Sequence, residues 1–395
     1  MTVIAVAGTT AEFIKLAPVL AHLDRDGIRH ELWTTCQHVE GVPETLAALG
    51  CRGPDRQLVG AGHRIDITRT TQVPLWAARV FVAGLRALAT TRRRRRLAGG
   101  DADLDLVLVH GDTMSTVLGA LAARLSGLPV AHLEAGLSST SLRDPFPEEL
   151  NRRIVRRLSR VHFAPTAHEV ANLERAGARG TIVHTHGNTV VDALVLADPE
   201  DAQPPGGQAD GSASTPELPA GPFGLVTLHR HELLRDGAEF ARTVRLLAGV
   251  DPAWQRRPDT LPLVFVAGGP ERRTIAETGL TSLVEERFFL VPKRPYAAFL
   301  PVLRRAAFVV TDSGGLQEEC AALGIPCAVH RRVTERRQGL GDNVVLTRME
   351  PAVLVGFLSR WRDFARPRAA GRCSPSAIVA EHLAALTRAT PEAVR

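Results

Sequence analysis

The stretch LVLVHGDTMSTVLGALAARLSGLPVAHLEAG, residues 106–136, decides the fold of this chain. It opens with an apolar run from Leu106 to His110, continues in a helical pattern from Met114 to Leu125 and closes with a second apolar run, Val130 to Leu133. A strand, a helix and a strand in this order are typical of a βαβ unit, in which the two strands lie parallel. We therefore predict a parallel α/β sheet around this stretch.

The same alternation of short apolar runs and longer helical patterns extends over both halves of the chain. In the first half it predicts strands at Val3 to Ala7, His30 to Thr34, Leu106 to His110, Val130 to Leu133, Val161 to Ala164 and Ile182 to His186. A second series is predicted at Gly224 to Leu228, Leu263 to Ala267, Phe288 to Val291, Phe308 to Thr311 and Cys327 to His330. Two such series predict an α/β protein with two doubly wound domains facing a cleft, where ligands bind beyond the carboxyl ends of the strands.

The boundaries of the two domains follow from composition. We place the N-terminal domain at residues 1–187 and the C-terminal domain at residues 188–368. The segment 198–222 is rich in Pro, Gly, Ser, Ala and Asp, so we interpret it as a flexible insertion. Residues 369–395 are expected to form a C-terminal helix that packs back on the N-terminal domain.

Length, cysteine usage and charge exclude several classes of protein. The chain has 395 residues, 45% of them hydrophobic, and no apolar run is expected to approach the roughly 20 residues of a membrane-spanning helix. Five widely spaced cysteines without a Cys-x-x-Cys pair suggest neither a disulfide framework nor a zinc site. With no secretory leader before Val3, we expect a cytoplasmic protein without a membrane partner.

The basic character of the chain does not indicate a nucleic-acid partner. The net charge is +6, which would suit a nucleic-acid binder. The one dense basic run, Arg92 to Arg96, follows an apolar helical stretch, where cations favour a helix C-terminus. No aromatic residues lie between these arginines to stack on bases, so we expect no nucleic acid.

A candidate anion site lies at Thr311-Asp312-Ser313-Gly314-Gly315-Leu316-Gln317-Glu318-Glu319, which passes from a strand through a tight turn into a helix. Glycines let backbone amides approach a phosphate, and the start of the following helix favours a negative charge. Glu319, about one turn later, is suited to a ribose diol. The alternative is that Ser-Gly-Gly only turns the chain and the glutamates complement the helix dipole.

Acidic residues follow two neighbouring strands in the first half. Asp112 comes after Leu106 to His110, and Glu134 comes after Val130 to Leu133, so both carboxylates are expected at one edge of one sheet. Glu148 stands at the start of a predicted helix. Asp112 has an alternative role as a helix N-cap, and Glu148 as a complement to a helix dipole.

A histidine and arginines follow strands of the second series. His229 and Arg230 end its first strand and offer an acid or base beside a cation. Arg331 follows the strand Cys327 to His330, where it is placed to contact phosphate oxygens. A structural histidine and solvated surface arginines are the alternatives at these positions.

Together these pieces resemble a known family. The order of the following motifs is similar to that in the non-hydrolysing UDP-N-acetylglucosamine 2-epimerases, over nearly the whole chain. They are Gly8-Thr9, Glu12, Ile14-Lys15-x-Ala17-Pro18, Gln37-His38, His110-Gly111-Asp112-Thr113, Glu134-Ala135-Gly136-Leu137, Pro147-Glu148-Glu149-x-Asn151-Arg152, Gly187-Asn188-Thr189-x-x-Asp192-Ala193, His229-Arg230, Asp312-Ser313-Gly314-Gly315-x-Gln317-Glu318-Glu319 and Thr334-Glu335-Arg336.

The resemblance implies a fold, an activity and a set of site residues. The fold would be two Rossmann-like domains in the GT-B arrangement of two-domain glycosyltransferases, assembled as a homodimer that needs no metal or other cofactor. The activity would be interconversion of UDP-N-acetylglucosamine and UDP-N-acetylmannosamine by elimination of UDP to a 2-acetamidoglucal and its re-addition. The implied catalytic residues are Asp112, Glu134, Glu148 and His229. The implied UDP-sugar ligands are Lys15, Arg152, Ser313, Gly314, Gly315, Glu319 and Arg331.

The chain departs from the family pattern at three positions that bear on the substrate. Thr10 and Ser138 stand where the family usually has arginine, and Cys36 stands where glycine is common. A hydrolysing relative that releases N-acetylmannosamine and UDP, a glycosyltransferase of the same architecture and a UDP-sugar-binding module are therefore the alternatives.

Overall fold

The computed structural model describes residues 2–39, 41–60, 72–97, 105–139, 147–197, 218–252, 254–255, 260–368 and 373–388. The chain forms two compact units, one of Met1–Asp201 with Gly371–Arg395 and one of Ala202–Ala370. The first unit extends past the predicted boundary at residue 187 because α7 (Val190–Leu196) packs against α1 (Thr10–Arg25). Of the predicted insertion, residues 198–217 lie outside the described residues.

The first unit is built on a parallel sheet of seven strands in the order β3-β2-β1-β4-β5-β6-β7. Its strands are β1 (Val3–Ala7), β2 (His30–Thr34), β3 (Arg56–Gln57), β4 (Leu106–His110), β5 (Val130–Leu133), β6 (Val161–Ala164) and β7 (Thr181–His184). Its further helices are α2 (Val42–Ala48), α3 (Val73–Leu97), α4 (Met114–Leu125), α5 (Glu148–Leu158), α6 (Ala167–Arg175) and α15 (Pro375–Arg388). β1, β4 and β5 are buried along their whole length, as expected for strands covered by helices on both faces.

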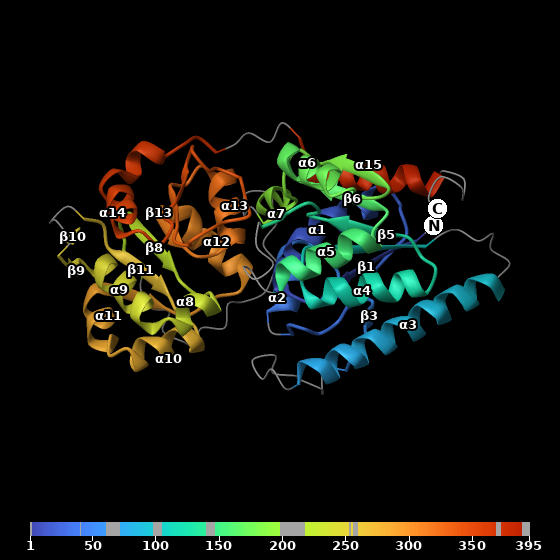
Figure 1. Ribbon diagram of the computed structural model, residues 1–395, viewed down its shortest axis with the longest axis horizontal. Coiled ribbons are helices and arrows are strands. Elements are labelled where there is room, and N and C mark those ends of the chain that lie inside the picture. Colours follow the sequence, from blue (N-terminus) through green and yellow to red (C-terminus); the bar gives the residue numbers. More distant parts are fainter. Residues whose placement is uncertain are drawn as a thin grey trace. The chain divides into compact units, whose positions relative to one another are not determined.

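The last described helix, α15, belongs to the first unit although it ends the described part of the chain (Figure 1). Its residues Val379, Ala380 and Leu383 are fully buried in the core that α1 and β1 also line. The backbone N–H of Ser376 donates to the Asp192 carboxylate on α7 at 2.7 Å. Apolar burial and this capping contact together fix α15 on the first unit.

The second unit has a parallel sheet of six strands in the order β12-β11-β8-β13-β14-β15. Its strands are β8 (Phe223–Thr227), β11 (Leu263–Val266), β12 (Phe288–Val291), β13 (Ala306–Thr311), β14 (Cys327–Val329) and β15 (Val344–Leu346), with a separate hairpin of β9 (Val250–Asp251) and β10 (Trp254–Gln255). Its helices are α8 (His231–Arg235), α9 (Gly237–Ala248), α10 (Gly269–Glu277), α11 (Thr281–Arg287), α12 (Tyr296–Arg305), α13 (Gly314–Leu323), α14 (Pro351–Arg360) and the 3₁₀ turn η1 (Trp361–Phe364).

Both sheets are doubly wound, which confirms the predicted fold class. In each, the strand order reverses beside the first strand of the unit, between β1 and β4 in the first and between β8 and β13 in the second. Ligands of such sheets bind at this switch point, beyond the carboxyl ends of the strands. The loops after β1, β4, β8 and β13 are therefore the places to look for a site.

The structure contains edge strands that the sequence patterns did not reveal. β3 has two residues and β15 has three, so neither gives a periodic pattern. β7 ends at His184 instead of His186, because His186 has a φ of 57° and leaves the extended conformation.

The expectation that no apolar run approaches the length of a membrane span is wrong for α3. Val73–Thr91 forms 19 residues with a mean hydropathy of 1.3, long and apolar enough by length and composition to cross a membrane. Trp76 and Val80 are each 1% exposed, in a cluster to which Leu118 of α4 also belongs. One side of α3 is therefore a core-facing surface of the first unit. The helix continues to Leu97, so Arg92 to Arg96 form its last turns.

Candidate active site

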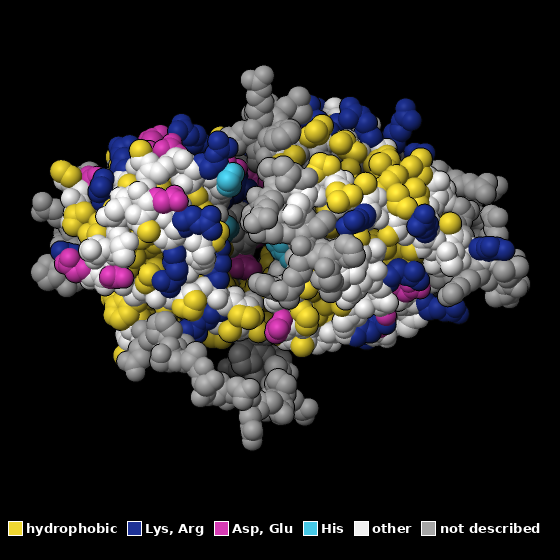
Figure 2. All heavy atoms as spheres, turned by 90° about the horizontal axis from the view of Figure 1, so that it is seen from below, with side chains coloured by type: hydrophobic (Ala, Val, Ile, Leu, Met, Phe, Trp, Pro, Cys, Tyr) yellow, Lys and Arg dark blue, Asp and Glu magenta, His cyan; other side chains and the backbone are white. Residues whose placement is uncertain are grey.

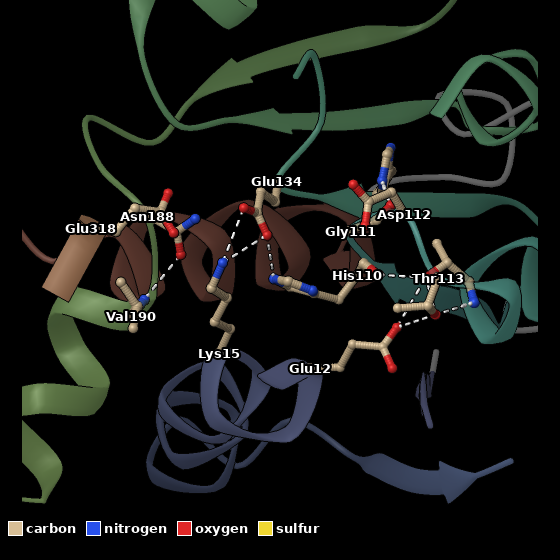
Figure 3. A network of polar contacts seen from close by, with 12 residues as sticks. Glu12, Lys15, His110, Gly111, Asp112, Thr113, Glu134, Asn188, Val190 and Glu318 are labelled. Carbon is tan, nitrogen blue, oxygen red and sulfur yellow. Dashed lines mark hydrogen bonds and ion pairs between the residues drawn. The ribbon is translucent and has the colours of Figure 1, made fainter. Parts of the chain in front are cut away.

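The centre of the site in the first unit is a buried ion pair between Lys15 and Glu134. Lys15 projects from α1, which begins after β1, and Glu134 directly follows β5 (Figure 3). The Lys15 ammonium lies 3.0 and 2.9 Å from the two Glu134 carboxylate oxygens, and the two side chains are only 6% and 4% exposed. Charges buried to this extent are stable only when paired, so each residue fixes the position of the other.

His110, which sequence reasoning quoted only within a motif, completes this cluster. It is the last residue of β4, and its Nε2 lies 3.2 Å from Glu134 Oε2 (Figure 3). Glu134 itself has a φ of 60°, a left-handed conformation that is costly for a residue with a side chain. Such strain is retained where the surrounding structure requires one orientation of a side chain, and here that side chain is the paired carboxylate.

The fold also requires glycine at position 136, two residues after the strained Glu134. Gly136 has a φ of 92°, and a Cβ atom on it would collide with the backbone carbonyl of Glu169 in α6. Asn172 of α6 donates to the Gly136 carbonyl at 3.0 Å. The Glu134-Ala135-Gly136 turn is therefore held against α6 at a separation that only glycine permits.

Asp112 is held by arginine and is not a helix cap. The Arg152 guanidinium donates from Nε at 2.8 Å and lies 2.6 Å through Nη2 from the same Asp112 oxygen, Oδ2. Asn151, next to Arg152 on α5, donates to the Asp112 carbonyl at 2.7 Å. The N-cap of α4 is Thr113, whose hydroxyl accepts from the Thr116 amide, so the N-cap alternative for Asp112 is wrong.

Glu12 connects the loops after β1 and β4. One of its carboxylate oxygens accepts from the backbone amides of Gly8 and Thr9, each at 2.8 Å, and the other accepts from the hydroxyls of Thr113 at 2.7 Å and Thr116 at 3.0 Å. Burial raises the pKa of Glu12, and these hydrogen bonds act in the opposite direction. Through Thr113, this one carboxylate positions the loop that carries Asp112.

Glu148 and Glu149 have different surroundings at the start of α5. Glu149 is 1% exposed and accepts from the hydroxyl of Ser138, the amide of Ser139 and the guanidinium of Arg153, so its role in the structure is to hold the loop after β5. Glu148 is half-buried in the first turn of α5, one helical turn before Arg152. Its assignment as a catalytic residue stays a prediction.

The second unit positions His229 through a buried aspartate. Asp312 follows β13 and is 1% exposed, and its carboxylate accepts from the backbone amides of His229 at 2.9 Å and Arg230 at 2.8 Å. The His229 ring, 40% exposed, lies with Nδ1 3.5 Å from Asp312 Oδ1. The loops after β8 and β13 are thus joined at the switch point of this sheet.

The Ser-Gly-Gly turn opens α13 as predicted. Ser313 is the N-cap, and its hydroxyl accepts from the Leu316 amide. A Cβ atom on Gly314 would lie 2.5 Å from Nε of Arg336, which pairs with Glu318 at 2.9 Å. The Arg336 side chain therefore lies at the start of α13. A guanidinium group and a helix start in one place are suited to phosphate oxygens.

Arg331 and Glu319 are both buried in the second unit. Arg331 is 7% exposed and lies 3.2 Å from Glu335, and burial lowers its pKa. Glu319 is 8% exposed, and together with burial it raises the pKa of Tyr296. Within the described ranges, no group of three or more His, Cys, Asp or Glu side chains is arranged to hold a metal ion.

The predicted site residues therefore fall into two groups. Those of the first unit are Lys15, Asp112, Glu134, Glu148 and Arg152, and those of the second unit are His229, Ser313, Gly314, Gly315, Glu319 and Arg331. The first group surrounds carboxylates, and the second surrounds an arginine-lined helix start. A doubly wound unit with acid–base groups and another with a helix start suited to phosphate oxygens are features expected of an enzyme that acts on a nucleotide-linked substrate.

Comparison with known proteins agrees with this class. The sequence profile of the UDP-N-acetylglucosamine 2-epimerase family matches residues 90–366. The UDP-N-acetylglucosamine 2-epimerase of Salmonella typhimurium is 32% identical over 349 residues, 87% of this chain and 86% of that protein. A putative UDP-N-acetylglucosamine 2-epimerase of Thermotoga maritima is 33% identical over 87% of this chain and 83% of that protein. The chain belongs to the UDP-N-acetylglucosamine 2-epimerase family.

The fold is also shared with solved structures. The UDP-GlcNAc 2-epimerase from Neisseria meningitidis, solved with UDP-GlcNAc bound, has a TM-score of 0.73 at 24% identity, over 98% of this chain and 100% of that one. This similarity shows that the fold of both units is shared.

Proposed function

We propose that this protein interconverts UDP-N-acetylglucosamine and UDP-N-acetylmannosamine without net hydrolysis. The observation that carries the proposal is the buried Lys15–Glu134 pair, with His110 at 3.2 Å, beside an Asp112 held by Arg152. Epimerisation at C2 needs more than one proton carrier, because a proton leaves one face of the sugar and returns to the other. This cluster supplies several acid–base groups at one sheet edge.

The chemistry of the sugar requires elimination. The C2 proton is not acidic, because no carbonyl is adjacent to that carbon, so it leaves as the C1–O bond to UDP breaks. The products are a 2-acetamidoglucal and UDP. Protonation of C2 from the opposite face and return of the UDP oxygen to C1 give the epimer, with atoms and charge balanced.

The two units divide this work in the proposal. Carboxylates of the first unit exchange the C2 proton, while Ser313, Gly314 and Arg331 of the second unit bind the diphosphate and stabilise the charge that develops on it. Oxyanion stabilisation of this kind contributes on the order of 2.7–4 kcal/mol per donor. His229, oriented by Asp312, is the acid or base that the second unit adds.

Solvent deuterium tests the mechanism. In D2O, UDP-N-acetylmannosamine formed from unlabelled UDP-N-acetylglucosamine should carry deuterium at C2, and the recovered substrate should become labelled as well. Glu134→Gln should abolish the labelling, whereas Glu285→Gln, on an exposed face of α11, should not change it. Labelled free N-acetylmannosamine with UDP would select the hydrolysing alternative, and unlabelled sugar from folded protein would refute elimination.

We further propose that the protein is a homodimer that buries the exposed apolar side of α3. Leu75 and Val82 of α3 are 55% and 42% exposed, and Figure 2 shows hydrophobic side chains over the first unit on the side that α3 occupies. Exposed apolar surface of this kind is typical of an interface. Light scattering should give twice the 42.5 kDa of one chain. In Val82→Glu the mass should fall to that of one chain. The control Val195→Glu on α7, at a residue that is 49% exposed, should leave the mass unchanged.

A cytoplasmic location is also proposed. All five cysteines are free thiols, and Cys320 and Cys327 are buried without forming a disulfide. Oxidising compartments favour disulfides, so free thiols fit a reducing one. Cell fractionation with an antibody against the chain tests this location.

A further inference from the structure

A cavity in the first unit is lined by Arg152 and by three arginines that the proposed reaction does not use. Its volume is 290 Å³, and it lies between the loop after β5 and the helices α5 and α6. Four arginines line it, with Glu149 as the one carboxylate in its wall; they are Arg152, Arg153, Arg156 and Arg175. The wall of this cavity, which we call the arginine cavity, is therefore positively charged.

The regular spacing of α5 produces this wall. Glu149, Arg153 and Arg156 recur at intervals of four and three residues, so they lie on one face of the helix. Glu149 pairs with Arg153 at 3.0 Å and lies 3.6 Å from Arg152, which already holds Asp112. The Glu149 carboxylate is thus shared between Arg152 and Arg153. It is also the one carboxylate in the wall for the other two arginines.

Arg156 is the cavity arginine that the shared Glu149 compensates only at longer range, without direct contact. It is half-buried and forms neither an ion pair nor a hydrogen bond with any residue in the described part of the chain. Burial, with repulsion from Arg157 and Arg153, lowers its pKa. Arg175 on the opposite wall uses one N–H to donate to Asn172 at 3.0 Å. A bound anion would relieve this repulsion.

A buried histidine, His132, also lines the cavity. This residue is 2% exposed, and its Nε2 lies 2.7 Å from the Gly111 carbonyl, so Nε2 carries the hydrogen. Burial lowers the pKa of His132 to about 4, which keeps the ring neutral near pH 7. Its Nδ1 is thus an acceptor, and none of the described residues donates to it. A neutral His132 adds no charge to the wall, so the arginines determine which ligand the cavity favours.

Ser138 lines the cavity and leaves room in it. Its short side chain donates to Glu149 Oε1 at 3.2 Å. An arginine side chain at this position would occupy much more space and add a further positive charge to the wall.

We propose that the arginine cavity binds a phosphate group, either orthophosphate or a small phosphate monoester. Arginine matches phosphate oxygens with two parallel N–H donors, and a phosphate carries more negative charge than a carboxylate, which suits a wall with four guanidinium groups. The volume of 290 Å³ is at the lower end of the roughly 300–1,000 Å³ of small-molecule sites, so it suits a small ligand and not a nucleotide sugar.

Occupancy of the arginine cavity is expected to affect the proposed active site through Arg152. This residue lines the cavity and also holds Asp112 with two contacts. An anion in the cavity competes for the Arg152 guanidinium, so it should lower turnover at saturating substrate. This last step rests on the proposed function, whereas binding of phosphate does not.

Binding is tested by calorimetric titration of the full chain with sodium phosphate at constant ionic strength, with UDP in excess to occupy the nucleotide site. We expect one phosphate per chain. Arg156→Gln should weaken the affinity by roughly ten- to a hundredfold, since one charged hydrogen-bonding group is lost. Arg175→Gln, on the exposed opposite wall, should weaken it in the same direction. The matched control is Arg157→Gln, an exposed neighbour that does not line the cavity, and it should leave the affinity unchanged.

The remaining outcomes separate the sources of phosphate and the two proposals. Tighter binding of glycerol 3-phosphate than of orthophosphate would identify an ester as the ligand, and the reverse would identify the free anion. No binding of either, loss of binding when UDP is present, or equal loss in Arg157→Gln would overturn the site. Unchanged turnover at saturating phosphate would refute the coupling through Arg152. A chain without epimerase activity that still binds phosphate would contradict the proposed function alone.

Discussion

Replacing Lys15 by Met should destabilise the first unit by about 3–5 kcal/mol, the usual result of removing one partner of a buried ion pair. The structure gives the reason for this magnitude. The Lys15 ammonium contacts both oxygens of Glu134, at 3.0 and 2.9 Å, with both side chains almost fully buried. Two charge-assisted hydrogen bonds of about 1.5–3 kcal/mol each disappear. Met has a similar length and fills the space, so the loss reports a buried carboxylate without its ammonium partner and not a cavity.

Urea unfolding followed by tryptophan fluorescence measures this loss. Trp33 and Trp76 are buried in the first unit, whereas Trp254 and Trp361 belong to the second. Replacing the latter two by Phe leaves a signal that reports only the first unit. The free energy of unfolding is then compared between the parent chain and Lys15→Met.

The double variant Lys15→Met with Glu134→Gln is the matched control. A neutral amide needs no countercharge, so the double variant should recover most of the stability that the single variant loses. A loss below about 1 kcal/mol, typical of an exposed pair, would refute the reasoning. So would a double variant no more stable than Lys15→Met.

Two further predictions concern the second unit. Arg331→Ala should weaken UDP binding by roughly ten- to a hundredfold in calorimetry, because a buried guanidinium is lost. The control Arg332→Ala, at an exposed neighbouring residue, should bind UDP normally. Normal UDP binding by Arg331→Ala would refute the assignment of Arg331 to the phosphate. Burial lowers the pKa of His330 to about 4, so below its ordinary value of about 6.5 only the unfolded chain takes up the proton. The contribution of His330 to stability should fall with decreasing pH by about 1.4 kcal/mol per unit, or about 3 kcal/mol by pH 4. His330→Gln should remove this part of the pH dependence, and parallel stability curves for the two proteins would contradict the prediction.

The sequence alone determined the fold class and the edges at which the site lies. Buried parallel strands such as Val3–Ala7 and Leu106–His110 are continuous apolar runs, because helices cover both faces of the sheet. The chemical groups at their carboxyl ends, Asp112 and Glu134 in one unit and His229 and Ser313 in the other, therefore stand out directly after each run. Motif order added the family, to which the profile match and the 32–33% identical relatives also assign the chain.

The sequence did not reveal which groups the individual side chains contact. From the sequence, a helix cap was an alternative role for Asp112, and the structure shows that Thr113 occupies that position. The roles of Glu12 and Asp312, which join loops from different strands, depend on hydrogen bonds over separations of about a hundred residues in the chain. The long apolar helix α3 was missed as a candidate span, and the short strands β3 and β15 have too few residues to form a pattern.

The arginine cavity shows most clearly which features the sequence determines and which only the tertiary structure decides. In the sequence, Arg153 and Arg156 are ordinary members of an arginine-rich chain, and abundant arginine gives no local signal. Strand patterns are local, because each run of side chains records the burial of its own strand. Ion pairing is not local, because a charge is compensated by whichever group the fold brings near it. The sequence by itself thus determined the two doubly wound units and the residues at their edges. Only the tertiary structure decided that Lys15 contacts Glu134 directly and that Glu149 is the one carboxylate in a cavity wall with four arginines.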